Sequence, residues 1–143
     1  MGAGAAGVCL LTWLVGLSWY DITQRRLPNW LTVPGAVAIL MGAAAAGGGA
    51  PALAGAVSLF AIYFALHLIA PAAMGAGDVK LAIGIGALTG AFGIDVWSLA
   101  ALTAPLLTAG WALIARVSSM ETTVPHGPSM CVTAAAATTL AIL

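Results

Sequence analysis

The sequence predicts an all-α membrane protein with about six transmembrane helices, and three observations lead to this fold class. Hydrophobic residues make up 62% of the chain, charged residues only 6%, and the mean hydropathy is +1.10. Long apolar stretches alternate with short segments that are rich in glycine, proline and charge. The 143 residues leave room for several spans of about 20 residues, but not for a separate soluble domain as well. We therefore expect a single polytopic membrane domain over residues 1–143.

The apolar stretches place the helices in order, at about 3–20, 31–47, 52–72, 79–94, 97–115 and 127–143. Each joint contains turn-forming or charged residues: DITQRRLPN, GGGAP, PAAMGAGD, FGID and RVSSMETTVPHGP. The fourth stretch is short for a bilayer core about 30 Å thick. No basic residue precedes the first stretch and no clear cleavage site follows it, so we do not expect a removable signal peptide.

All the basic residues lie in every second joint between the expected helices. Joints one, three and five contain all of them, namely Arg25, Arg26, Lys80 and Arg116. Under the positive-inside rule these joints are cytoplasmic, and the N- and C-termini lie outside the cytoplasm. Aromatic residues typical of a membrane interface flank the first joint: Trp19, Tyr20 and Trp30. Close helix packing is expected where Gly86 and Gly90 form a GxxxG step.

Composition also excludes several functions. The net charge is zero with only four basic residues, so the chain has no basic surface for binding nucleic acid. Cys9 and Cys131 lie in separate apolar stretches and form no CxxC pair. We expect both cysteines to serve packing rather than a disulfide framework or a zinc site.

Four acidic residues are the candidates for chemistry, because an acidic side chain near a membrane is costly and often functional. Asp21 ends the first expected helix and Asp78 begins the fourth, which places both at the cytoplasmic face. Asp95 falls at the opposite face and Glu121 in the longest polar loop, so we expect solvated structural roles for both. For Asp78 alone, a helix N-cap is an alternative explanation.

Two neighbouring aspartates can catalyse the hydrolysis of a peptide bond. Two carboxylates held close together cannot both ionise easily, so they share a proton, and the pair can activate water while polarising a peptide carbonyl. Gly75 and Gly77 would let an extended substrate approach Asp78 and would permit backbone angles that other residues avoid. Two aspartates without a convergent histidine make a poor metal site, so we expect neither a metal nor an organic cofactor.

Three motifs resemble those of the type IV prepilin peptidases, which are GxGD membrane aspartic proteases. GAGDVKL at 75–81 resembles their GxGDxKL signature, and DITQRRLPN at 21–29 resembles the motif around their first aspartate. VPHGP at 124–128 is a third match, although the family usually has an apolar or aromatic residue in place of His126. The resemblance implies that Asp21 and Asp78 are the catalytic pair and that Gly75 and Gly77 shape the loop before Asp78.

Roles for the remaining motif residues stay open. Lys80 matches the family's lysine and either contacts substrate or anchors its helix at the membrane interface. Pro28 and Asn29 are expected to begin the second helix, and a local hydrogen bond is expected for His67. We assign no role to His126, and we expect Arg25 and Arg26 to fix topology.

The resemblance implies cleavage of the leader peptide of type IV prepilin-like precursors, either pilins or pseudopilins, at the cytoplasmic face of the bacterial inner membrane. The substrate would be a basic leader followed by a hydrophobic helix that shares the lipid bilayer with the enzyme. Longer family members carry a cysteine-containing cytoplasmic region and an N-methyltransferase activity. This sequence instead resembles the short Tad/Flp-type members, so we expect peptidase activity without methylation.

Three alternatives remain. The same scaffold could act on a preflagellin-like or presenilin-like substrate. A small proton- or cation-coupled transporter could use Asp21 and Asp78 to bind its ion, but it predicts aspartates deep in the helices and broken helices near the midplane. A structural subunit or inactive relative in a secretion apparatus is the third, and the presence of both aspartates and both glycines argues against it.

Overall fold

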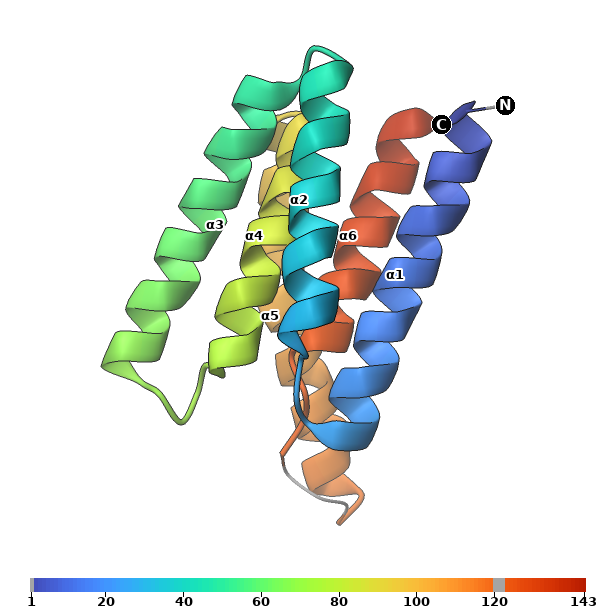
Figure 1. Ribbon diagram of the computed structural model, residues 1–143. Helices are drawn as coiled ribbons and strands as arrows, with labels where there is room; N and C mark the ends of the chain where they lie inside the picture. Colours follow the sequence, from blue (N-terminus) through green and yellow to red (C-terminus); the bar gives the residue numbers. More distant parts are fainter. Residues whose placement is uncertain (1, 120–122) are drawn as a thin grey trace.

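The computed structural model describes residues 2–119 and 123–143, and the regular structure of these residues is entirely helical. In chain order the helices are α1 (Gly2–Gln24), α2 (Asn29–Ala45), α3 (Gly49–Ile69), α4 (Ala76–Ala91), α5 (Ile94–Val117) and α6 (Gly127–Ile142). They run alternately up and down, and both termini lie at the same end of the bundle (Figure 1). Each of these helices lies within a few residues of its expected range, so the predicted all-α class is confirmed. Glu121 lies outside the described residues.

The outer surface of the bundle is suited to lipid. Helices α1, α3 and α5 are each long and apolar enough to cross a membrane, while α2 and α6 are shorter apolar helices. Large apolar side chains face outward along α1: Val8, Leu11, Val15, Trp19 and Ile22. Such exposure would be unfavourable in water but matches hydrocarbon. The chain is therefore a membrane protein, while the number of spans and the side on which the termini lie stay predictions.

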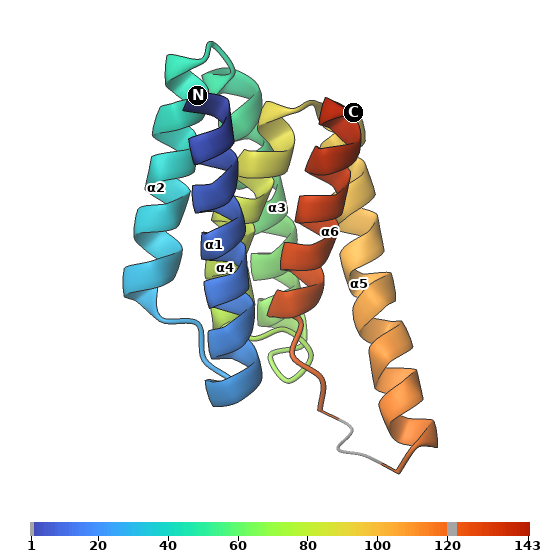
Figure 2. The same ribbon diagram turned by 90° about the vertical axis from the view of Figure 1, so that its right-hand side faces the viewer.

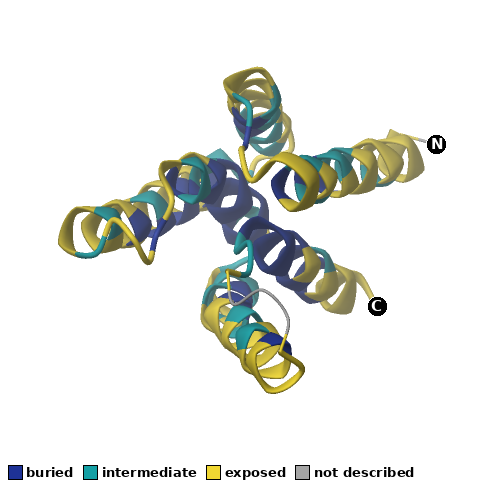
Figure 3. Cartoon of the chain, turned by 90° about the horizontal axis from the view of Figure 1, so that it is seen from below, coloured by how far each residue is buried: buried dark blue, intermediate teal, exposed yellow. Residues whose placement is uncertain are grey.

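Helix α4 occupies the centre of the bundle, and most of its residues are buried. Seen from below, the buried residues gather along the middle of the molecule while the outer helices are exposed on their outward faces (Figure 3). The side view shows α4 behind α1, while α6 lies at the front between α1 and α5 (Figure 2). Because α4 is covered by protein, it does not need the lipid-facing apolar surface of a peripheral span.

The α3–α4 contact is the most extensive one between helices in the described part of the chain, and glycines replace side chains in it on both helices. A Cβ atom on Gly86 would collide with the carbonyl oxygen of Gly55, and one on Gly90 would lie 2.6 Å from the carbonyl oxygen of Pro51. The Trp97 indole N–H also donates to the Gly55 carbonyl at 3.1 Å. The predicted packing role of the GxxxG step is therefore confirmed, and it locks the helix that carries Asp78.

Helix α1 is held differently. One face of it is buried through Leu14, Leu17 and Asp21, and it packs mainly against α6. Toward α2 the main link is Trp13, whose indole N–H donates to the Leu31 carbonyl at 2.8 Å. The Trp13 ring occupies space left by the glycines at positions 35 and 84 of α2 and α4. A single aromatic wedge therefore joins α1 to α2 and α4.

Candidate active site

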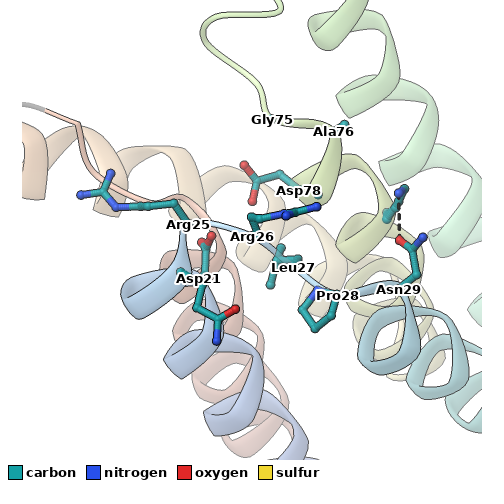
Figure 4. Close-up of a pocket in the computed structure, with 12 residues that line it drawn as sticks. Asp21, Arg25, Arg26, Leu27, Pro28, Asn29, Gly75, Ala76 and Asp78 are labelled. Carbon is teal, nitrogen blue, oxygen red and sulfur yellow. Dashed lines mark hydrogen bonds between the residues drawn. The ribbon is translucent and has the colours of Figure 1, made fainter.

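The two aspartates singled out in the sequence lie in one pocket. Asp21 comes from the last turn of α1 and Asp78 from the first turn of α4, at the same end of the bundle (Figure 4). The pocket has a volume of about 500 Å³. Its other lining residues run from the end of α1 to the start of α2 and surround the start of α4: Gln24, Arg25, Arg26, Leu27, Pro28, Asn29, Gly75, Ala76, Gly77 and Lys80. Each carboxylate is thus beside a mainly polar cavity that opens at the end of the helices.

Asp21 is withdrawn from water and held by the start of another helix. Its side chain is 8% exposed, and its Oδ2 accepts a hydrogen bond from the Gly127 backbone N–H at 2.9 Å. Arg25 lies one turn further along and acts electrostatically on the same carboxylate. The Arg25 guanidinium also donates to the Thr123 carbonyl at 2.7 Å, which ties the segment after α1 to the segment before α6.

Gly127 supplies that donor because of its place in the chain. It is the first residue of α6, and Pro128 follows it. The first N–H groups of a helix have no partner within the helix, so the Gly127 N–H is free to bind a carboxylate. A Cβ atom at this position would collide with Asp21 Oδ2. Gly127 was not among the predicted site residues, although a Gly-Pro step at a helix start signals an available N–H group.

Asp78 is positioned by its own helix. Gly75 is the N-cap residue of α4, so Asp78 lies in the first turn and the alternative in which Asp78 is itself the cap is wrong. A carboxylate in the first turn faces the positive end of the helix dipole, and the Gly75 N–H reaches it. The charge of Asp21 also acts on Asp78, as expected for two carboxylates that share a cavity.

The glycines before Asp78 have ordinary backbone conformations. Gly75 has φ −69° and ψ 147°, which any residue adopts, and neither Gly75 nor Gly77 has a positive φ. The expectation that they permit unusual backbone angles is therefore wrong. What Gly77 provides is room, because a Cβ atom there would lie 3.2 Å from Leu27 Cβ. The segment after α1 can thus approach the start of α4.

Comparison with known families identifies the family of the chain. A family model described as the type IV leader peptidase family matches residues 8–143. The chain belongs to this family. The predicted family is therefore confirmed, and the protein is a membrane peptidase with a protein substrate. The match includes both aspartates and all three motifs from the sequence analysis. Comparison with curated proteins and with solved structures gave no match.

In this leader peptidase, Lys80 joins two of the motifs. Its Nζ donates to Asn29 Oδ1 at 2.8 Å, which links α4 just after Asp78 to the first residue of α2. Asn29 does begin α2, and Pro28 precedes it as the N-cap residue, so the expected helix start is confirmed. Lys80 therefore has a partner within the protein in addition to its place on the pocket wall.

Other candidate residues of the peptidase have local roles. His67 Nδ1–H donates to the Met74 carbonyl at 2.7 Å, which confirms the expected local hydrogen bond. Asp95 is exposed in the first turn of α5, at the far end of α4 from Asp78. Cys131 is buried as expected, but Cys9 is exposed on α1, so a packing role for Cys9 is wrong. Within 2–119 and 123–143, no group of three histidine, cysteine or acidic side chains is arranged to hold a metal ion.

Proposed function

We propose that this leader peptidase is an aspartic endopeptidase in which Asp21 and Asp78 are the catalytic pair. One observation carries the proposal: two carboxylates that lie 57 positions apart in the chain line the same pocket at the ends of their helices. Each is held by a backbone N–H group, so the two side chains are oriented before a substrate arrives. Preorganised groups of this kind lower the cost of reaching the transition state.

The pair would work as a general acid and a general base. The ionised carboxylate takes a proton from a water molecule, whose oxygen attacks the peptide carbonyl carbon, while the protonated carboxyl gives its proton to the carbonyl oxygen. The resulting tetrahedral diol then collapses. The C–N bond breaks as the nitrogen receives a proton from the protonated member of the pair, while the ionised member takes a proton from one diol hydroxyl, which leaves a new carboxyl group and a new amine. One water molecule is consumed and the pair is restored.

The substrate would be a prepilin or pseudopilin precursor in the bacterial inner membrane, with the pocket facing the cytoplasm. A pocket at the end of the helices suits a leader that emerges from the bilayer beside a hydrophobic segment. We propose that the substrate backbone passes Gly75 and Gly77, which line the pocket beside Asp78 and have no side chains of their own. Lys80 lines the same wall and contributes to substrate binding, in addition to its contact with Asn29.

The transporter alternative has less support. A proton or cation carrier needs ion-binding groups within the membrane at broken helices. Asp21 and Asp78 instead lie in terminal turns, and α1 and α4 are continuous helices. A solvent-facing pocket at the ends of helices is better suited to a peptide than to an ion that crosses the bilayer.

The proposal is tested by cleavage of a panel of leader peptides, each attached to its hydrophobic segment, with the purified protein in detergent or lipid. Prepilin, pseudopilin and preflagellin leaders are compared side by side. We expect the Asp21→Asn and Asp78→Asn variants to lose at least about 1,000-fold in kcat/KM, as expected when a member of a catalytic unit is removed. Mass spectrometry of the product identifies the cut bond and also tests the expectation that the new N-terminus is not methylated.

Asp95→Asn is the matched control, because Asp95 is an exposed carboxylate at the opposite end of the bundle. It should cleave like the wild type. Retained cleavage by Asp78→Asn would remove the basis for an aspartyl pair. Cleavage of preflagellin leaders alone would keep the pair and replace the substrate.

A further inference from the structure

His126, for which the sequence predicts no role, joins three helices next to the pocket. Its Nε2 lies 2.8 Å from the Tyr63 hydroxyl of α3, and its Nδ1 lies 2.6 Å from the Thr108 hydroxyl of α5. His126 itself is the N-cap residue of α6. Tyr63 is buried, with 3% of its surface exposed, so this contact lies within the bundle rather than at its rim.

The direction of each hydrogen bond follows from Thr108. The Thr108 hydroxyl donates its hydrogen to the Ala104 carbonyl at 3.1 Å, so it accepts from His126 Nδ1–H. A neutral imidazole then has Nε2 as its acceptor, and Nε2 receives the Tyr63 O–H. Burial lowers the pKa of His126 to about 4, so the imidazole is neutral at physiological pH. The hydrogen bonds thus run in one direction, from the Tyr63 hydroxyl through His126 and Thr108 to the Ala104 carbonyl.

This network lies beside both aspartates, through the backbone at one end and through electrostatics at the other. The residue after His126 is Gly127, whose N–H donates to Asp21. The His126 carbonyl accepts from the Met130 N–H, so the histidine and the start of α6 form one unit. At the other end, Tyr63 lies within electrostatic reach of Asp78. The position of the imidazole therefore affects the donor to Asp21 and the neighbour of Asp78 together.

We propose that His126 is a positioning residue that holds the two aspartates in register through Tyr63 and Gly127. This inference rests on the proposed function, because it concerns the geometry of the same pair. The imidazole keeps the start of α6 at a fixed distance from α3 and α5. Without it, the Gly127 N–H loses its alignment with Asp21 while the helices remain folded, because the glycine contact between α3 and α4 lies elsewhere.

The test is a double-mutant cycle with His126→Phe and Tyr63→Phe, each measured for kcat and KM on the best-cleaved leader. We expect each single variant to lower kcat about 3- to 10-fold, the effect of one lost hydrogen bond, and to change KM less than about twofold. The double variant should be no slower than the slower single variant, because both changes interrupt the same chain. His126→Gln, which can still accept from Tyr63, should recover most of the kcat.

Ser58→Ala is the matched control, since it removes a hydroxyl that donates within α3 to the Ala54 carbonyl. It should leave kcat unchanged. If His126→Phe does not fold, Thr108→Val completes the cycle, because it removes the acceptor of Nδ1–H. Multiplicative losses in the double variant, or wild-type kcat in both single variants, would overturn the proposal.

Hydrogen exchange separates this proposal from the proposed function. In the absence of substrate, the peptide that contains Gly127 should exchange faster in His126→Phe and in Tyr63→Phe than in the wild type or in Ser58→Ala. Unchanged exchange would contradict the positioning role even if no leader is cleaved. Conversely, the variants could show faster exchange while the wild type cleaves none of the leaders. That result would support the positioning role of His126 and contradict the proposed substrate.

Discussion

The two halves of the aspartyl pair are held by different kinds of interaction. Asp78 stands on α4, a central helix that is locked against α3 by glycine-to-backbone contact. Asp21 stands at the end of α1, a peripheral helix whose outer face is exposed and whose carboxylate depends on one N–H group of α6. Packing spreads its effect over many atoms, whereas a single hydrogen bond can be lost by one substitution. We therefore expect substitutions around Asp78 to destabilise the fold, and substitutions around Asp21 to displace its carboxylate while the fold stays intact.

Breaking the packed half should have the largest effect. Gly86→Ala inserts a Cβ atom against the Gly55 carbonyl, where backbone must move to accommodate it. We expect the free energy of unfolding to fall by about 3 kcal/mol, the upper range for overpacking, with activity lost in proportion to the unfolded fraction. Denaturant titration in mixed micelles measures the change. Gly110→Ala is the control, because nothing lies within 4 Å of a Cβ at that position of α5.

Breaking the hydrogen-bonded half should leave the fold intact. Gly127→Ala places a methyl group against Asp21 Oδ2 and displaces the carboxylate from its donor. Since a small misplacement of a catalytic group can cost 100-fold, we expect kcat/KM to fall about 30- to 100-fold with little change in unfolding temperature. Gly16→Ala on α1 has room for its Cβ and should behave as wild type. Full activity in Gly127→Ala would show that Asp21 does not need this donor.

The smallest effect should come from removing the hydrogen bond between Lys80 of α4 and Asn29 of α2. Lys80→Met keeps the length of the side chain but removes the ammonium group that donates to Asn29. Because this hydrogen bond is exposed, we expect only about a two- to fivefold loss in kcat/KM. Asn29→Asp should retain the contact as an ion pair and keep most of the activity. A loss as large as that of Gly127→Ala would instead indicate direct substrate contact by Lys80.

Local patterns in the sequence were sufficient for the helices and for placing Asp21 and Asp78 at the same end of the bundle. Apolar stretches, turn residues and the sorting of basic residues place the first, third and fifth joints at one end of the bundle, as the structure does (Figure 1). Helix starts were misplaced by up to three residues, because glycine at the N-cap of α4 and of α3 is ambiguous between loop and cap. That shift is why Asp78 lies inside its helix rather than at the cap.

The contacts that hold the site could not be predicted in the same way. Gly127 and Asp21 are 106 positions apart, and no local pattern states which carboxylate a free helix N–H will meet. Lys80 and Asn29 were both singled out, but their contact depends on how α2 packs against α4. Trp13 was not identified at all, because one tryptophan in an apolar stretch gives no sign of the glycines that accommodate it.

The shared location of the chain ends has a practical consequence. Both termini emerge at the end of the bundle away from Asp21 and Asp78. The length of α1, 23 residues at 1.5 Å per residue, separates the two ends of the bundle by about 34 Å. The predicted topology places a reporter fused to either terminus on the opposite side of the bilayer from the pocket. One pair of fusions would thus reveal the compartment of the pocket without touching it, and immobilisation by either end would leave the entrance unobstructed.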